Sequence, residues 1–367
     1  MAQKSPPLHF SSLDAMLEPE ALAQIAGLAG NSPTLSRGAV AGGLSGASME
    51  RIAVRVQDSE QRFVIKQVDP ARDWLMIASG DTLCREVQFA RSPLSAQLSP
   101  DIVMPVLATA YTDHAGTLLM ADVSPALFDA RMCYEPADEA MAARIVDHLA
   151  AMHARFWEHP MLAQSEWLAT PFNAMFALTP VRLQLLFTQE QSGENTYGRD
   201  ALKRWFHLWH YLDPADAAAL QHVLAHPDPI LRALQSAPPT LAHGDAWLAN
   251  MGEDEQRLIL LDWALATAGP ATYDSLWFAH TWHSLDPDWV LATHRAALLR
   301  YGIAAVADDA TWALLADLGW VRTTLMGIEW LVREILISAN SQERDKAIMR
   351  LNSWCERAAQ IIRERGW

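Results

Sequence analysis

A short polar segment and the end of an apolar run carry side chains suited to phosphoryl chemistry. The segment is His243-Gly244-Asp245-Ala246-Trp247-Leu248-Ala249-Asn250, and the run Leu258-Ile259-Leu260-Leu261 leads into Asp262. An Asp five residues before an Asn can point a carboxylate at a substrate hydroxyl while the amide oxygen faces a metal ion. Phosphoryl transfer requires such groups, because the protein must align the acceptor oxygen, neutralise phosphate charge with magnesium and accept a proton. The spacing therefore predicts that Asp245 is catalytic and that Asn250 and Asp262 bind Mg²⁺.

A simpler interpretation gives this segment only a structural role. Short polar side chains such as His243, Asp245 and Asn250 often cap and fix a turn. The segment alone does not decide between the two interpretations, and charged residues elsewhere in the chain are needed.

A lysine and a glutamate earlier in the chain favour the chemical interpretation. Lys66 is one of four lysines and interrupts the apolar run 63–68, where a buried ammonium is costly without a partner. Glu86 lies at the border of the apolar face of a helix predicted over 81–90, where it can reach a lysine on a strand beneath. The alternative for Lys66 is an edge-strand lysine that faces water.

A glycine cluster precedes this lysine. Gly42, Gly43, Ser45 and Gly46 lie before the alternating strand 52–56, and the strands around Val40, at 52–56 and at 63–68 predict a β-meander with a polar turn at 58–61. Such glycines let the backbone approach nucleotide phosphates. The cluster is not a Walker A loop, because no Gly-Lys-Ser/Thr follows, and not a Rossmann fingerprint, because a β-meander follows where that motif begins a helix. It is not a hydrolase nucleophile elbow either, because Ala47 stands where that motif needs glycine. A plain hairpin turn remains the alternative.

The H-x-D-x-x-x-x-N spacing is the pattern of kinase catalytic loops. Here Gly244 stands where protein kinases have Arg, and Asp262 is followed by Trp263-Ala264 where they have Phe-Gly. This variant resembles the aminoglycoside phosphotransferase and choline or ecdysteroid kinase-like superfamily. The resemblance covers nearly the whole chain.

The resemblance implies a fold and a set of site residues. The fold is α+β, two-lobed and protein-kinase-like, with an N-lobe at 1–121 that holds a small antiparallel sheet and one main helix, and a large, mainly helical C-lobe at 122–367. ATP or GTP would lie between the lobes with Mg²⁺. Further implied roles belong to residues at matching positions: cofactor binding by Gly42, Gly43, Ser45, Gly46, Lys66 and Glu86, adenine binding by the backbone of a hinge at 118–124 including Met120 and Asp122, and structural support by His243 and Asp274.

Periodicity predicts the remaining elements. Helices are expected at 13–28, from Pro136 through Phe156, around 201–212 and 217–224, and from 288 to the end, with strands at 102–110 and 117–120. Met251-Gly252 and the run 258–261 are expected to pair as a hairpin that returns Asp262 close to Asn250. Asp274 is expected at the start of a helix, where an N-cap is its simpler role.

Composition limits the classes of function. The 367 residues suit two domains, and no apolar run approaches the roughly 20 residues of a membrane span, so a cytoplasmic protein without a membrane partner is expected. The formal net charge of −15 argues against a nucleic-acid partner, because phosphate backbones require clustered Lys and Arg. The three cysteines are far apart and are expected to be buried thiols. The spacing of His148, His153 and His159 favours packed side chains over a zinc site.

The expected function is that of a small-molecule kinase. It would transfer the γ-phosphoryl group of ATP, or GTP, to a hydroxyl of a small-molecule acceptor, whose identity the sequence leaves open. Two alternatives come from other classes: a catalytically silent, nucleotide-binding regulatory protein of the same fold, and a hydrolase that uses a Ser and a His.

Overall fold

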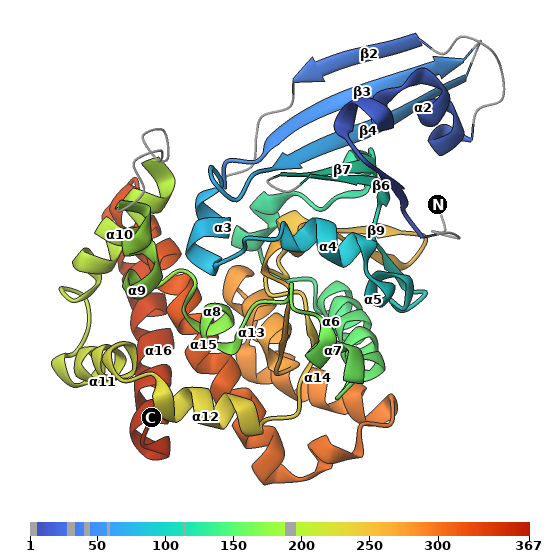
Figure 1. Ribbon diagram of the computed structural model, residues 1–367. Coiled ribbons are helices and arrows are strands. Elements are labelled where there is room, and N and C mark those ends of the chain that lie inside the picture. Colours follow the sequence, from blue (N-terminus) through green and yellow to red (C-terminus); the bar gives the residue numbers. More distant parts are fainter. Residues whose placement is uncertain (1–5, 28–33, 40–44, 57–58, 113–114, 188–195) are drawn as a thin grey trace.

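The computed structural model has two parts, a sheet with short helices and a larger helical part (Figure 1). It describes residues 6–27, 34–39, 45–56, 59–112, 115–187 and 196–367. Gly42, Gly43 and the strand expected around Val40 lie outside the described residues. The α+β class and the two-part architecture that the sequence predicts are confirmed.

The first part is built on a six-stranded sheet. In spatial order the strands are β1 (Leu8–Phe10), β6 (Val106–Tyr111), β7 (Gly116–Ala121), β4 (Ser59–Val68), β3 (Ser48–Val56) and β2 (Thr34–Ala39). Four of the pairings are antiparallel, but β1 pairs with β6 in parallel, so the sheet is mixed and not purely antiparallel as expected. The polar turn expected at 58–61 is too long, because β4 already begins at Ser59.

Short helices accompany this sheet, where one main helix was expected. They are α1 (Leu13–Leu17), α2 (Pro19–Ala26), α3 (Trp74–Ser79), α4 (Arg85–Arg91) and α5 (Pro93–Ala96). Pro19 splits the helix expected at 13–28, because proline is tolerated at the first position of a helix and not inside one. The helix expected at 81–90 begins only at Arg85, since Cys84 has a left-handed backbone with φ 55°.

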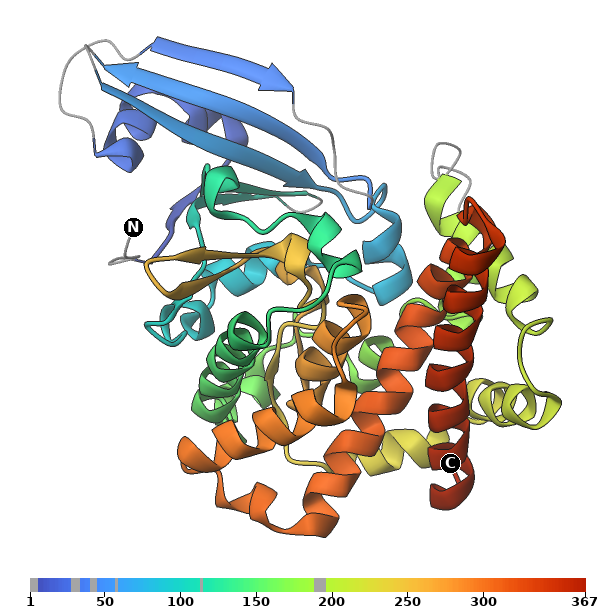
Figure 2. The same ribbon diagram turned by 180° about the vertical axis from the view of Figure 1, so that it is seen from behind.

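The second part is mainly helical. Its helices are α6 (Glu139–Arg155), α7 (Pro160–Gln164), α8 (Pro171–Phe176), α9 (Pro180–Leu183), α10 (Thr196–Leu208), α11 (Pro214–Ala225), α12 (Asp228–Ser236), α13 (Thr272–Thr281), α14 (Pro287–Arg300), α15 (Asp309–Ile337) and α16 (Ser341–Arg365). The long helix expected from Pro136 starts later, because the Asp138 side chain caps it by accepting from the backbone N–H groups of Ala140 and Met141. In both views α15 and α16 run side by side (Figures 1 and 2).

Two small sheets complete the fold. One contains β5 (Ile102–Val103), β10 (Arg257–Leu260) and β9 (Met251–Asp254), and the other pairs β8 (Thr240–Ala242) with β11 (Thr267–Gly269). The expected hairpin is confirmed, since β9 and β10 pair antiparallel with Leu260 opposite Met251. Because β5 also pairs with β10, the hairpin is joined to the segment that precedes β6.

One hydrophobic core continues across the junction of the two parts. It contains Val64 and Phe89 from the first part together with Leu149, Leu258 and Trp263 from the second. A separate cluster fills the space between the sheet and α1 and α2, and another packs the helical part. No helix that the structure describes has the length and apolar character needed to cross a bilayer. The shared core fixes the ends of β4, α4 and β10 relative to one another.

Candidate active site

Strand periodicity turns Lys66 toward α4. Successive side chains of a strand point to opposite faces, and Phe63 and Ile65 pack in the cluster under α1 and α2. Val64 and Val68 face the shared core on the other side. Lys66 has the same parity as these valines, and it is only 7% exposed. The edge-strand alternative is therefore excluded, because β4 lies between β3 and β7.

Lys66 joins two carboxylates from distant parts of the chain. Its Nζ lies 2.7 Å from Glu86 Oε2 and 3.0 Å from Asp262 Oδ1. Burial alone would lower the pKa of Lys66, but the two carboxylates outweigh it and raise that pKa. Burial raises the pKa of Glu86 to about 7 in spite of Lys66, and Asp262 adds to this increase. Burial also acts on Asp262, but Lys66 holds the pKa of Asp262 below its usual value. Of the two acids, Asp262 therefore carries the charge more readily.

Asp262 has a strained backbone that is fixed on both sides. Its φ of 61° is left-handed, which is uncommon for a residue with a Cβ. The preceding Leu261 donates its N–H to the carbonyl of Asn250 at 2.8 Å, and its own carbonyl lies 2.8 Å from His243 Nε2. On the other side, the ring of Trp263 stacks on Phe89 of α4 with centroids 4.1 Å apart. Asp262 is thus tied both to loop 243–250 and to the helix that carries Glu86.

Loop 243–250 orients the Asp245 carboxylate. Asn250 Nδ2 donates to Asp245 Oδ2 at 2.9 Å and to the Asp245 carbonyl at 3.0 Å. The indole N–H of Trp277 donates to the other carboxylate oxygen at 2.8 Å. Burial, with repulsion from Asp262, raises the pKa of Asp245 to about 6, although both hydrogen bonds act in the opposite direction. The carboxylate is held in one orientation and ionises close to neutral pH.

A buried carboxylate holds the start of the same loop. Asp274, fully buried on α13, accepts from the backbone N–H groups of His243 and Gly244, each at 2.8 Å. It also lies 3.0 Å from His153 Nε2, and His153 Nδ1 lies 3.0 Å from His294 Nε2. Burial opposes ionisation of Asp274, but these donors hold its pKa at about 2. α13 starts at Thr272, so Asp274 lies within the first turn and is not the N-cap.

The loop also requires a glycine between His243 and Asp245. Gly244 has φ +84°, and a Cβ there would lie 2.2 Å from the carbonyl oxygen of Leu265. Its carbonyl accepts from Arg322 at 2.7 Å. The structure thus explains why a side chain such as Arg does not fit at this position.

Replacing Gly244 with alanine is expected to destabilise the fold more than Gly302→Ala. Gly302 has nearly the same φ, +87°, but a Cβ there meets nothing within 4 Å, so it serves as a control for backbone strain alone. The difference in the free energy of unfolding should be about 1–3 kcal/mol, the usual cost of overpacking. Urea denaturation of both variants measures it, and equal losses would contradict the steric explanation.

The glycine turn and the expected hinge are described only in part. Gly46 has φ +109°, and the Ser45 hydroxyl donates to Asp73 Oδ2 at 2.7 Å. Met120 lies inside β7, opposite Val64 of β4. The backbone N–H of Asp122 donates to the Arg62 carbonyl at 3.0 Å.

The Asp122 carboxylate has partners of its own. It forms an ion pair with Arg51 at 2.9 Å. A role of Met120 or Asp122 in nucleotide binding therefore stays a prediction.

Two oxygen donors suit a small divalent cation. Because Asn250 directs its amide N–H₂ to Asp245, its amide oxygen is left to accept a ligand, and 39% of the Asp262 side chain is exposed. Mg²⁺ takes few protein oxygens and keeps waters and phosphate oxygens as its other ligands, so this donor set fits it. Among the described residues no group of three or more His, Cys, Asp or Glu side chains is arranged to hold a metal by itself.

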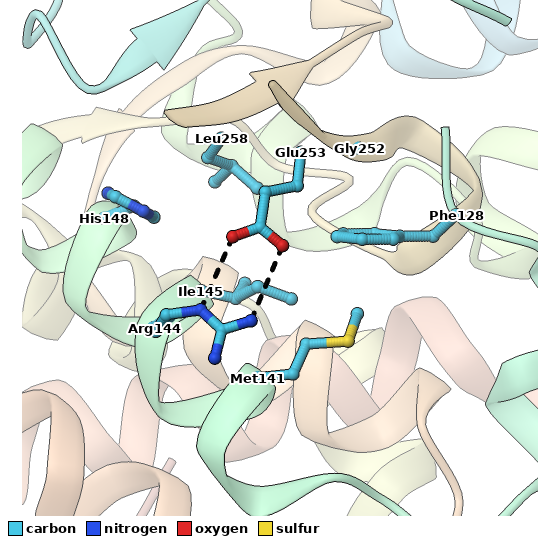
Figure 3. Close-up of a pocket in the computed structure, with 8 residues that line it drawn as sticks. All are labelled: Phe128, Met141, Arg144, Ile145, His148, Gly252, Glu253 and Leu258. Carbon is cyan, nitrogen blue, oxygen red and sulfur yellow. Dashed lines mark hydrogen bonds and ion pairs between the residues drawn. The ribbon is translucent and has the colours of Figure 1, made fainter. Parts of the chain in front are cut away.

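The small cavity in Figure 3 lies elsewhere. It is lined by α6, the β9–β10 hairpin and the ring of Phe128, and its volume is about 10 Å³, room for one water. Arg144 and Glu253, which line it, form an ion pair at 3.5 Å. None of the site residues expected from the sequence lines this cavity.

Three residues near the site were not anticipated from the sequence. Trp277 contacts the Asp245 carboxylate, Arg322 holds the Gly244 carbonyl and Asp73 accepts from Ser45. Trp277 follows Asp274 by three residues on a helix, which places both on one face. This spacing could have indicated that Trp277, like Asp274, points toward loop 243–250. Asp73 caps α3 by accepting from the backbone N–H groups of Leu75 and Met76. An Asp directly before a helix is a capping pattern that can be recognised in a sequence.

Comparisons with known proteins give distant likenesses. No protein-family model and no curated protein matches the sequence. Choline kinase from Cryptosporidium parvum aligns over 90% of this chain and 90% of its own, at 8% identity and a TM-score of 0.48. Ethanolamine kinase from Plasmodium vivax covers 88% of this chain and 81% of its own, at 14% identity and a TM-score of 0.42.

A third likeness is to a thermostable mutant of an aminoglycoside phosphotransferase in complex with AMP-PNP and hygromycin B. It covers 93% of this chain and 98% of its own, at 13% identity and a TM-score of 0.38. At such identities and scores, none of the three decides the reaction of this chain.

Proposed function

We propose that this protein transfers the γ-phosphoryl group of ATP, or GTP, to a hydroxyl of a small molecule with the help of Mg²⁺. The observation that carries the proposal is the contact of Lys66 with both Glu86 and Asp262, 2.7 and 3.0 Å away. In kinase-like sites a strand lysine paired with a helix glutamate holds nucleotide phosphates, and an Asp binds the metal. Two opposed parts, divided near residue 121, would hold the nucleotide between them.

Each residue of the site has a chemical task in this proposal. Lys66 would bind the phosphates and Glu86 would orient Lys66, while Asn250 and Asp262 would hold Mg²⁺, which neutralises phosphate charge when bound. Asp245 would orient the acceptor hydroxyl and take its proton. A carboxylate whose pKa is about 6 suits this task, because it is ionised at neutral pH and yet is more basic than an exposed Asp. Among the residues that the structure describes, this geometry gives no support to the Ser and His hydrolase alternative.

Nucleotide binding and nucleoside diphosphate release test the proposal separately. Titration with ATP and GTP, with Mg²⁺ or with EDTA, should show binding that Mg²⁺ strengthens. A panel of amino, neutral and acidic alcohols should then contain members that release nucleoside diphosphate above the rate with water. Absence of nucleotide binding would refute the proposal, and binding without release across the panel would favour the silent regulatory protein.

The pH dependence of turnover should report on Asp245. Its carboxylate must be ionised to accept a proton, so kcat should rise with pH through about 6. Trp277→Phe removes a hydrogen bond that lowers this pKa, so the midpoint should move to higher pH and kcat should fall about 10-fold.

A matched substitution controls for the loss of an indole. Trp282→Phe removes an indole N–H that donates to the carbonyl of Glu135 at 3.2 Å and not to the site. Profiles of kcat against pH for both variants make the comparison. A midpoint unchanged in Trp277→Phe would contradict the assignment of that pKa to Asp245.

A further inference from the structure

Two pairs of aromatic side chains join separate elements, one pair from α3 and α10 and the other from loop 243–250 and α15. Trp74 begins α3 and donates its backbone N–H to the carbonyl of Ser45 at 3.0 Å, and its ring lies 5.3 Å from the ring of Tyr197 on α10. Trp247 belongs to the loop that carries the proposed base, and its ring lies 6.1 Å from that of Trp330 on α15. Trp247, Trp330 and Tyr197 are each partly exposed. We call these three residues the aromatic row, and Trp74, which contacts Tyr197, is buried.

Arg333 connects the two pairs. Its guanidinium carbon lies 4.9 Å from the ring centre of Trp330 and 6.0 Å from that of Tyr197. The side chain is half-buried near the end of α15. A guanidinium that stacks on aromatic rings keeps its N–H groups free at its edge for a ligand.

The charges around Arg333 do not balance. Glu329, one turn earlier on α15, is already engaged by Arg204 at 2.8 Å and by the Tyr197 hydroxyl at 3.2 Å. Among the described residues, no carboxylate lies within 4 Å of the Arg333 nitrogens and no acceptor is hydrogen-bonded to them. Within the part of the chain that the structure describes, Arg204, Arg333 and Glu329 thus place two cations beside one anion, in a chain whose formal net charge is −15. A half-buried guanidinium that shares one carboxylate with a second cation is costly unless a ligand supplies another anion.

On the basis of the proposed function, we propose that Arg333 and the aromatic row bind the acceptor, and that this acceptor is an alcohol carrying an oxyanion on an apolar body. The planar fork of Arg333 matches a carboxylate or a phosphate with two parallel hydrogen bonds. The rings of Trp247 and Trp330 provide flat apolar surface for the body of the molecule. Since Trp247 is two residues from Asp245, an acceptor anchored at Arg333 extends its hydroxyl toward the base. A cationic alcohol is disfavoured by the same surplus charge.

A set of probes with one skeleton tests the charge of the acceptor. The probes are 4-(hydroxymethyl)phenylacetate, its amide, the amine of the same skeleton and the phosphonate of the same skeleton. Equilibrium titration measures the binding of each probe to the full-length protein, to Arg333→Met and to Arg344→Met. Arg344 is an exposed residue of α16, so its replacement removes the same charge without touching the aromatic row. Nucleoside diphosphate release with MgATP is recorded separately for every combination of protein and probe.

The carboxylate or the phosphonate should bind the wild-type protein about 10- to 100-fold more tightly than the amide, and the amine should bind most weakly. Arg333→Met should abolish this preference, and Arg344→Met should retain it. The ratio of carboxylate to phosphonate affinity identifies which oxyanion is preferred. Binding of the amide or amine as tight as that of the acids, or an unchanged preference in Arg333→Met, would overturn the inference.

Turnover then separates the two proposals. Release of nucleoside diphosphate with the amide or the amine, but not with the acids, leaves the phosphotransferase proposal standing and overturns the oxyanion acceptor. Binding of the acids that depends on Arg333, without nucleotide binding, refutes the phosphotransferase proposal and retains an oxyanion site at Arg333.

Discussion

Replacing Asp245 with alanine is expected to lower kcat by about 10²- to 10⁴-fold, the usual contribution of a positioned general base. The affinity for the magnesium nucleotide should change little, because the Lys66 contacts with Glu86 and Asp262 involve no atom of Asp245. Steady-state kinetics with any alcohol that supports turnover measures the first quantity. Equilibrium titration with nucleotide measures the second.

Two further variants make the Asp245 experiment specific. Asp245→Asn keeps the shape of the side chain and can still accept from Trp277, but it cannot take a proton, so its kcat should fall as far as that of the alanine variant. Asp228→Asn removes an exposed carboxylate from the first turn of α12 and should leave kcat unchanged. Turnover of Asp245→Ala at the wild-type rate would refute the base assignment.

The contact between Lys66 and Glu86 was predictable because each residue conflicts with its surroundings in the sequence. A lysine with the parity of Val64 and Val68 has to be buried, and a buried ammonium needs a carboxylate. A glutamate at the border of an apolar helix face can supply it. The structure brings the two within 2.7 Å. Local patterns were sufficient because the partner is only twenty residues away.

Asp262 was predictable as a strand-end carboxylate but not in its conformation. Its left-handed φ of 61° and its 3.0 Å contact with Lys66 depend on how the hairpin is fixed to loop 243–250. The carbonyl of Leu261 accepts from His243 only once both segments are folded. Such tertiary contacts leave no periodic signal in a sequence.

For the same reason, the sequence did not predict the contacts through which distant helices support the site. Arg322 lies 78 residues after Gly244, whose carbonyl accepts from it. A long helix with an arginine among apolar residues predicts a buried charge, but it does not predict the partner. The spacing of His153 predicted a packed side chain. Its contact with Asp274, 121 residues away, came only from the packing of α6 against the helices that follow loop 243–250.

Replacing Asp262 with asparagine should remove the effect of Mg²⁺ on nucleotide affinity and lower kcat about 10³-fold. Asp262 carries its charge more readily than Glu86, since Lys66 lowers its pKa, and 39% of its side chain is exposed for a ligand. A metal that loses its only charged protein ligand no longer neutralises the phosphates, which is worth several kcal/mol in the transition state. The fold should persist, because Lys66 keeps Glu86 as a partner.

Titration with ATP in Mg²⁺ and in EDTA measures the loss directly. In the wild-type protein the affinity should be higher with Mg²⁺, and in Asp262→Asn the two affinities should agree. Glu255→Gln, whose side chain is 85% exposed in the turn of the same hairpin, removes one charge from the same region and should keep the Mg²⁺ effect. An Asp262→Asn variant that binds nucleotide with undiminished dependence on Mg²⁺ would mean that the metal site lies elsewhere, because Asn250 alone offers the ion only a neutral amide oxygen.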